Sequence, residues 1–263
     1  SDKSSWLHDF DGWDLEAYCY VDWHKPKTPI PKSGLAIGTI QEVHNPNVIE
    51  KADEVLEKFP ILTCENEPQQ TKKIGDDEIL KYLICEGLRP SAADELTNTI
   101  RRIRLLAEYY YRNVKLWPEV REHETRTFLV IPLLIALGWA EQRIKIELPC
   151  RTSRGRIDIA CFSTPYKGKD DKCLLIIETK GFSSGLDFAP KQAIDYSKDF
   201  PECETVFVTN GYCYKAYVKK NGEFTEKPFA YLNLIKPKDK YPIDPDNVEG
   251  ALDVLRLLLP FNL

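Results

Sequence analysis

Residues 155–196 read GRIDIACFSTPYKGKDDKCLLIIETKGFSSGLDFAPKQAIDY. In residues 156–162, three apolar side chains alternate with Asp158, which predicts a strand. Residues 173–178 are nearly all apolar, a pattern typical of a central strand that is buried on both faces. This stretch therefore predicts two neighbouring strands in the middle of a sheet.

The end of the second strand carries charged side chains. Because side chains alternate along a strand, Glu178 and Lys180 are expected on one face, with Thr179 pointing away. A carboxylate and an ammonium there are unfavourable unless they have a function. Asp158 and Glu178 converging from adjacent strands suit Mg²⁺, which binds through one or two carboxylates and keeps several waters. A lysine beside them could hold a water or help to deprotonate it.

A simpler interpretation competes with this one. A lone Asp followed about 20 residues later by Glu-x-Lys occurs by chance in many sequences, and strand ends often carry exposed charge. The choice between the two depends on the neighbouring motifs.

A helix and a strand are expected just before this stretch. The apolar residues 128–137 predict a helix that packs against the sheet and that Pro132 would kink. Glu124 lies in its first turn, where the helix dipole favours an acid whatever its function. Residues 143–150 alternate Ile144 and Ile146 with polar side chains and predict the first strand of the sheet. Residues 143–156 hold five basic residues and one acidic residue, which places positive charge beside the carboxylates.

Several motifs of this chain follow one another in an order that resembles a known family. They are Glu124-x-Arg126, Leu137-Gly138-Trp139, Gly155-Arg156-x-Asp158, Glu178-x-Lys180, Gln192-x-x-x-Tyr196 and Thr209-Asn210-Gly211. Residues 119–260 resemble the PD-(D/E)XK nuclease superfamily, in particular the N-terminal nuclease domain of type I restriction enzyme R subunits. The sequence departs from those subunits in one respect, because it contains no G-x-x-x-x-G-K-[S/T] phosphate loop and therefore no translocation motor.

The resemblance implies a fold, a reaction and a set of roles. The fold would be a restriction-endonuclease-like α/β fold, with a mixed sheet flanked by helices, and the reaction would be hydrolysis of phosphodiester bonds. Asp158 and Glu178 would bind Mg²⁺, with Mn²⁺ as a substitute, and Lys180 would orient water or act as a general base. Glu124 would reach the metal through water, although Glu122 could take its place.

The remaining roles concern the nucleic acid. Gln192 and Tyr196 lie four residues apart on one helical face and would position the DNA backbone or support Lys180, although ordinary helix-surface polarity explains them as well. Arg126 would bind phosphate or brace the carboxylates. The residues expected to contact the nucleic acid are Arg126, Arg154, Arg156 and Tyr196.

Composition sets the wider limits. The chain has 263 residues with 43% hydrophobic content, enough for a substantial core, and a net charge of -5. A nucleic-acid surface must therefore be local. The longest apolar run is too short to cross a membrane, and no signal peptide is recognised, so we expect a soluble cytoplasmic protein without a membrane partner.

The organisation before residue 119 is less informative. Residues 1–75 are expected to form a region of unknown role, with a strand within residues 1–23, an extended proline-containing loop and a helix over residues 48–59. Residues 76–118 are expected to form two helices, the first closed by Gly87 and the second capped by Ser91. A helix-turn-helix and two ordinary packed helices both fit, and residues 101–121 hold six basic and two acidic residues. Residues 119–263 are expected to form the nuclease-like domain. Within it, residues 214–219 and 224–234 are expected to form strands joined by a hairpin turn at Asn221-Gly222, and residues 248–259 to form the last helix.

The sequence thus predicts a Mg²⁺-dependent DNA endonuclease of the restriction or DNA-processing type. Subunits of a restriction system are candidate partners, and a homo-oligomer is compatible with the sequence. Two alternatives stay open. One is a catalytically silent module that keeps the nuclease fold and binds DNA or a partner, and the other is an RNA nuclease.

Overall fold

A computed structural model describes residues 46–58, 71–113, 120–152, 155–168, 171–182, 185–186, 189–242 and 244–260. The chain forms two compact units, of which one comprises residues 15–67 and the other residues 1–14 and 68–263. In the smaller unit, helix α1 (Pro46–Lys58) confirms the helix expected over residues 48–59. The strand expected within residues 1–23 and the loop after it lie outside the described residues.

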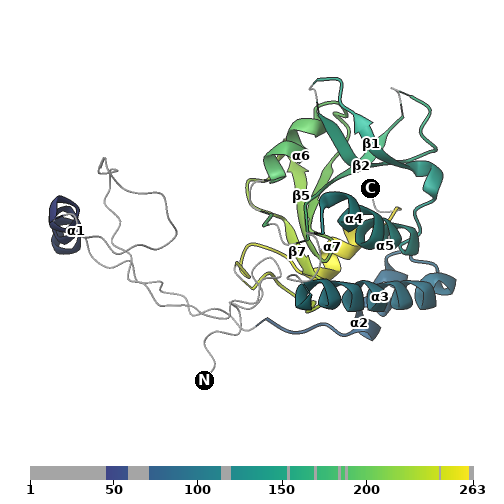
Figure 1. Cartoon of the computed structure of the whole chain (residues 1–263). Helices are drawn as coiled ribbons and strands as arrows, with labels where there is room; N and C mark the ends of the chain where they lie inside the picture. The colour runs from purple at the N-terminus through teal and green to yellow at the C-terminus, as the bar shows by residue number, and fades with distance from the viewer. Residues whose placement is uncertain are drawn as a thin grey trace. The chain divides into compact units, whose positions relative to one another are not determined.

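The larger unit is built around a mixed seven-stranded sheet (Figure 1). Its strands are β1 (Ile144–Pro149), β2 (Arg156–Phe162), β3 (Cys173–Thr179), β4 (Thr205–Thr209), β5 (Cys213–Lys220), β6 (Glu223–Phe224) and β7 (Ala230–Asn233). They lie in the order β1-β2-β3-β4-β5-β6, and β7 also pairs with β5. Strands β3 and β4 run parallel, and the other pairs are antiparallel. The expected mixed sheet is therefore confirmed.

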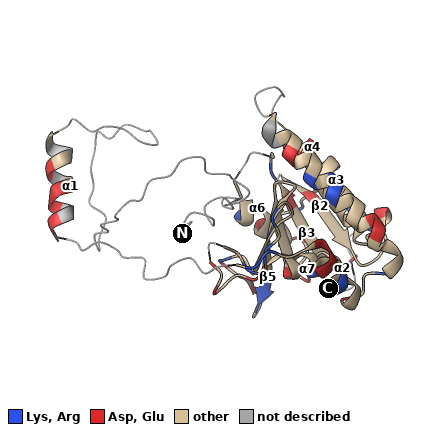
Figure 2. Cartoon of the chain, turned by 90° about the horizontal axis from the view of Figure 1, so that it is seen from below, with Lys and Arg blue, Asp and Glu red and all other residues tan. Residues whose placement is uncertain are grey.

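Helices cover the sheet on both sides. They are α2 (Asp76–Cys85), α3 (Ala93–Arg112), α4 (Glu122–Thr125), η3 (Arg126–Val130), α5 (Ile131–Ala136), α6 (Ala189–Ser197) and α7 (Ala251–Leu257). Helix α6 packs on β3 and β4, α7 packs on β5 and β7, and α3 packs on α5. Seen from below, α6 lies on one side of the sheet, and α2, α3 and α4 lie on the other (Figure 2). The α/β fold with flanking helices is thus the fold of this unit.

The helices and the sheet share one hydrophobic core. Its buried residues run from Ile74 in the segment before α2 to Leu259 after α7, and both α2 and α3 contribute to it. The indole N–H of Trp139, which follows α5, donates a hydrogen bond to the carbonyl of Leu258, 2.7 Å away. The apolar faces of α2 and α3 are therefore packed, while Arg101 and Arg102 stay exposed.

The expected helix over residues 128–137 forms with an irregular start. Residues Arg126–Val130 take a π-helical turn before the α-helical turns of α5 begin. Pro132 has no N–H to donate to a carbonyl of the preceding turn, and a π-turn accommodates this loss without breaking the helix. The helix continues through Pro132 after a wider turn that contains Arg126, and the kink at Pro132 stays a prediction.

Three expectations about local structure are wrong. Ser91 does not cap the second helix, because it lies in a 3₁₀ turn (Pro90–Ala92) and Ala92 takes the N-cap position without a side-chain hydrogen bond. Residues 224–234 do not form one continuous strand, and the interruption between β6 and β7 contains Pro228, whose missing N–H weakens strand pairing. The last helix begins at Ala251 rather than at Val248.

Two turns follow the sequence closely. Gly87 has a positive φ of 107° after α2, and the N–H of Leu88 donates to the carbonyl of Leu83, which confirms the expected helix end. Asn221 and Gly222 both have positive φ in the turn between β5 and β6, as the hairpin motif requires. Among the described residues, no helix is long and apolar enough to cross a membrane.

Candidate active site

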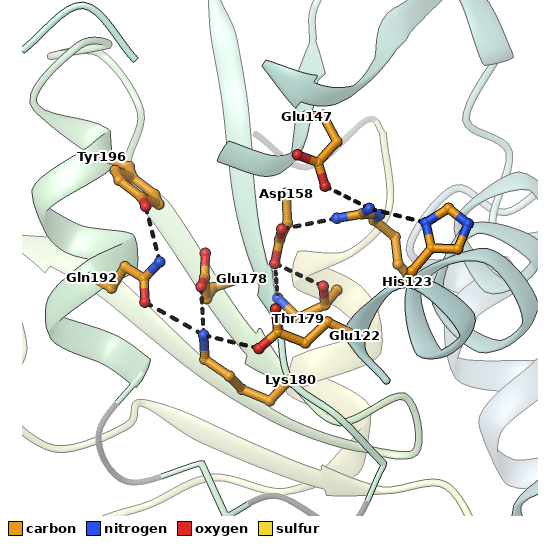
Figure 3. A network of polar contacts seen from close by, with 10 residues as sticks. Glu122, His123, Glu147, Asp158, Glu178, Thr179, Lys180, Gln192 and Tyr196 are labelled. Carbon is orange, nitrogen blue, oxygen red and sulfur yellow. Dashed lines mark hydrogen bonds and ion pairs between the residues drawn. The ribbon is translucent and has the colours of Figure 1, made fainter. Parts of the chain in front are cut away.

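Asp158 and Glu178 lie next to each other on adjacent strands (Figure 3). Strands β2 and β3 are antiparallel, in a register that sets Asp158 opposite Glu178 when it is continued one residue beyond Ile159. Residues opposite each other in such a pair have Cβ atoms about 5 Å apart. The two carboxylates that the sequence singled out are therefore brought together by the register of the sheet.

Hydrogen bonds fix Asp158 from two sides. Its Oδ1 accepts from Nη1 of Arg126 at 2.9 Å, and its Oδ2 accepts from both the N–H and the hydroxyl of Thr179 at 2.7 Å. Thr179 was expected to point away from the site, which is wrong. The pairing of β2 with β3 ends at Ile159 and Ile177, one position short of Asp158. The carboxylate of Asp158 therefore takes the place of a strand carbonyl as the acceptor for the N–H of Thr179.

Glu178 is almost fully buried and has one oxygen without a partner. Its Oε1 accepts from Nζ of Lys180 at 2.7 Å, whereas its Oε2 is buried and has no hydrogen-bond partner among the described residues. Burial, and then the charge of Asp158, raises the pKa of Glu178 to about 7, although Lys180 acts in the opposite direction. A buried acceptor without a donor is unfavourable and indicates a position that a cation or a water can satisfy.

Lys180 connects both sides of the site. Its Nζ lies 2.7 Å from Glu178, 3.4 Å from Oε1 of Gln192 and 3.6 Å from Oε1 of Glu122. Burial alone would lower the pKa of Lys180, but the hydrogen bond to Glu178 and the charges of Glu178 and Glu122 outweigh it and raise this pKa. Lys180 is therefore a protonated donor at neutral pH.

Gln192 and Tyr196 lie on one face of α6, as expected. The amide nitrogen of Gln192 donates to the hydroxyl of Tyr196 at 2.9 Å, which leaves its oxygen to accept from Lys180. The side chain of Tyr196 is mostly buried and lies over Gly155, where a Cβ atom would come within 2.4 Å of the hydroxyl. The absence of a side chain at Gly155 therefore leaves room for the ring of Tyr196, whose hydroxyl orients Gln192.

The structure brings Glu122, and not Glu124, to Lys180. Glu124 accepts a hydrogen bond from the N–H of Arg121 at 3.2 Å, which is the helix-start role that its position alone explained. Burial, followed by the charge of Glu124, also raises the pKa of Tyr110. Of the two acids that the sequence left open, Glu122 is therefore the one beside the site.

The basic residues predicted to contact nucleic acid are placed differently. Arg126 is buried and bound to carboxylates, the bracing arrangement that the sequence allowed, and its phosphate contact stays a prediction. Arg156 is exposed at the start of β2, two residues before Asp158 on the same strand. Arg154 lies outside the described residues.

Sequence reasoning missed two side chains beside Arg126. Nη2 of Arg126 lies 2.6 Å from Oε1 of Glu147 and 3.4 Å from Nδ1 of His123. Glu147 was taken only as a polar residue of the first strand. Its place in the site follows from the antiparallel register of β1 and β2, which sets Glu147 opposite Asp158 and which the residue pattern of one strand does not show.

The donor set fits a hard divalent cation held by few protein ligands. Among the described residues, no three His, Cys, Asp or Glu side chains are grouped as a ready metal cage. Mg²⁺, however, commonly binds through one or two carboxylates and retains several waters. Asp158 and Glu178 supply those two carboxylates, and Oε2 of Glu178, to which no residue in the described ranges donates, is an oxygen that such an ion can use.

Comparisons of this chain with protein-family models, with curated proteins and with solved structures found no match. The class of protein is therefore described from the fold and the site alone. It is an α/β protein with a mixed sheet that carries Asp158, Glu178 and Lys180 at one end of the central strands β2 and β3.

Proposed function

We propose that this chain is a metal-dependent nuclease that hydrolyses phosphodiester bonds in DNA, of the restriction or DNA-processing type. The observation that carries the proposal is the buried Glu178, which lies next to Asp158 and binds Lys180 through one oxygen, while no described residue donates to its other oxygen. Buried carboxylates without full hydrogen bonding are unfavourable for stability alone. This arrangement also supports the resemblance to PD-(D/E)XK nucleases, with its motifs in one order.

Asp158 and Glu178 would hold Mg²⁺, for which Mn²⁺ could substitute. When bound there, such an ion supplies Lewis-acid chemistry and lowers the pKa of water. Thr179 and Arg126 orient Asp158, so that its carboxylate does not have to reorganise. Lys180 keeps its proton and donates hydrogen bonds, which favours a role in orienting water and stabilising negative charge over a role as general base.

The remaining polar residues support positioning of the substrate. Gln192 holds Lys180 from α6, and Glu122 approaches it from α4. Arg156 and Arg151 are exposed at the end of the sheet where β1 and β2 meet. Exposed basic residues beside a carboxylate site are suited to a phosphate backbone, which would otherwise be repelled.

The proposal is tested by incubating the purified protein with plasmid DNA, single-stranded DNA and matched RNA, in Mg²⁺, Mn²⁺ or chelator. We expect metal-dependent cleavage of DNA that is lost in Asp158→Asn and Glu178→Gln, with both variants folded. Cleavage of RNA in preference to DNA would change the substrate class. Salt-sensitive DNA binding that survives Lys180→Ala, with no cleavage in either metal, would favour a silent binding module instead.

A further inference from the structure

Glu147 has an unusual backbone conformation inside strand β1. Its φ is 53°, in the left-handed region that residues with a side chain rarely adopt. Such a conformation is unfavourable and persists only where the surrounding structure compensates for it. Here the carboxylate of Glu147 forms an ion pair with Nη2 of Arg126 at 2.6 Å. The strained residue is therefore the one that holds Arg126.

Arg126 is bound by carboxylates from two neighbouring strands. Its Nη2 forms an ion pair with Glu147, and its Nη1 lies 2.9 Å from Oδ1 of Asp158. The side chain of Arg126 is only 6% exposed, so its charge is removed from water. A guanidinium is planar and holds its donors in a fixed fork, so two acids that bind its two terminal nitrogens fix its position.

The sheet sets three carboxylates in one row. Strand β1 pairs with β2 on both sides of Glu147, in a register that sets this residue opposite Asp158. The register of β2 and β3, continued one position beyond Ile159 and Ile177, sets Asp158 opposite Glu178. In two-metal sites the ions lie about 4 Å apart, which a shared central carboxylate allows. Asp158 is the central carboxylate here, with Glu178 on one side and Glu147 on the other.

The charges of the site match one divalent ion. Arg126 pairs with Glu147 and Asp158, and Lys180 pairs with Glu178 and lies near Glu122. At formal charges, these four carboxylates and two cations leave two negative charges. A single divalent ion neutralises them, whereas a second would leave the site positive.

We propose that Arg126, held in place by Glu147, occupies the position of a second metal ion and limits the site to one divalent cation between Asp158 and Glu178. This inference rests on the proposed function, because it concerns the same metal site. Arg126 and Glu147 are positioning residues in it, and neither has to contact the substrate.

The test counts the Mn²⁺ ions that the metal-free protein binds, from the electron paramagnetic resonance signal of the free ion. Ions that bind elsewhere on the surface are subtracted by using Asp158→Asn as the baseline. We expect one ion in the wild type and two in Arg126→Ala, because the two carboxylates released from the guanidinium can then hold a cation. Arg126→Ala combined with Glu147→Gln should return to one ion.

The outcomes distinguish a failure of the role of Arg126 from a failure of the proposed function. Two ions in the wild type, or one in a folded Arg126→Ala, would overturn the role of Arg126 and leave the nuclease proposal standing. No ion in the wild type beyond the Asp158→Asn baseline would overturn both. If Arg126→Ala does not fold, Arg126→Gln removes the charge, keeps more of the volume and is expected to give the same count of two.

Discussion

At the scale of single residues, Glu178 should make the stability of the metal-free protein depend on pH. Burial, with the charge of Asp158 as the second cause, raises its pKa to about 7, whereas an unfolded glutamate titrates near pH 4.3. The folded protein therefore binds this proton more tightly than the unfolded chain. We expect the free energy of unfolding to fall by on the order of 3 kcal/mol as the pH rises from about 4 to about 7.

The measurement is urea unfolding of wild type and Glu178→Gln across this range, with chelator present. Glutamine cannot ionise, so the variant should lack this part of the pH dependence and gain in relative stability as the pH rises. Equal pH dependence in the two proteins would show that Glu178 keeps an ordinary pKa.

Lys180 should shift the same titration. Its hydrogen bond and charge lower the pKa of Glu178 against the effects of burial and Asp158. Lys180→Met should therefore raise this pKa, so that the fall in stability extends to higher pH than in the wild type. Lys191→Met is the matched control, because Lys191 is exposed on α6 next to Gln192. The prediction is wrong if both methionine variants titrate alike.

The site residues that the sequence revealed are those with a local pattern. Asp158 and Glu178 stand out because strand alternation and apolar neighbours make their charges conspicuous. Glu147 and Thr179 do not, because their roles depend on the register between strands. The choice between Glu122 and Glu124 depends on the direction of one short helix relative to Lys180, which the sequence does not contain.

At the scale of elements, the turn after β4 packs closely against helix η3 at Gly211. Gly211 has a φ of 97°, and a Cβ atom there would lie 2.4 Å from Cδ1 of Leu129. Gly211→Ala should therefore destabilise the protein through both backbone strain and a steric clash, by on the order of 3 kcal/mol.

Gly222 offers the control for the backbone contribution. It also has positive φ, at 86°, but a Cβ atom there would meet no atom of the described part of the chain within 4 Å. Gly222→Ala should cost on the order of 1 kcal/mol, from strain alone. Chemical unfolding of both variants separates the two contributions, and an equal loss would show that the contact with Leu129 does not matter.

Element type was predictable where hydrophobic periodicity was long and clear, as in β2, β3 and α2. It failed where backbone hydrogen bonding decided the outcome. Residues 126–130 form a π-turn ahead of Pro132, and Ser91 takes part in a 3₁₀ turn rather than a cap. Both depend on how the chain satisfies individual N–H and carbonyl groups, which residue pattern alone does not determine.

At the scale of the whole molecule, α2 and α3 belong to the same core as the sheet. Residues such as Leu83 and Ile103 are buried in one cluster with Leu133 and Leu255. We expect a chain that begins at residue 68 to unfold in one cooperative transition, followed by circular dichroism in urea. A chain that begins at residue 120 should fail to fold, because it leaves the apolar face of α5 uncovered. A stable fold from residue 120 onward would show that the two helices are dispensable.

The class of the fold was predictable because two apolar strands, an apolar helix and a hairpin are enough to indicate a sheet flanked by helices. How tightly α2 and α3 join that sheet was not predictable. The sequences of α2 and α3 fit an independent helical segment equally well. Only the tertiary packing distinguishes such a segment from helices that share the core of the sheet.

The central claim is that Lys180, Asp158 and Glu178 form a site for phosphodiester hydrolysis. The most direct test measures cleavage of plasmid DNA with Mn²⁺ by wild type, Lys180→Met and the matched Lys191→Met side by side. We predict cleavage by wild type and Lys191→Met, and a loss of at least about 100-fold in Lys180→Met. Equal cleavage by all three proteins would contradict the claim.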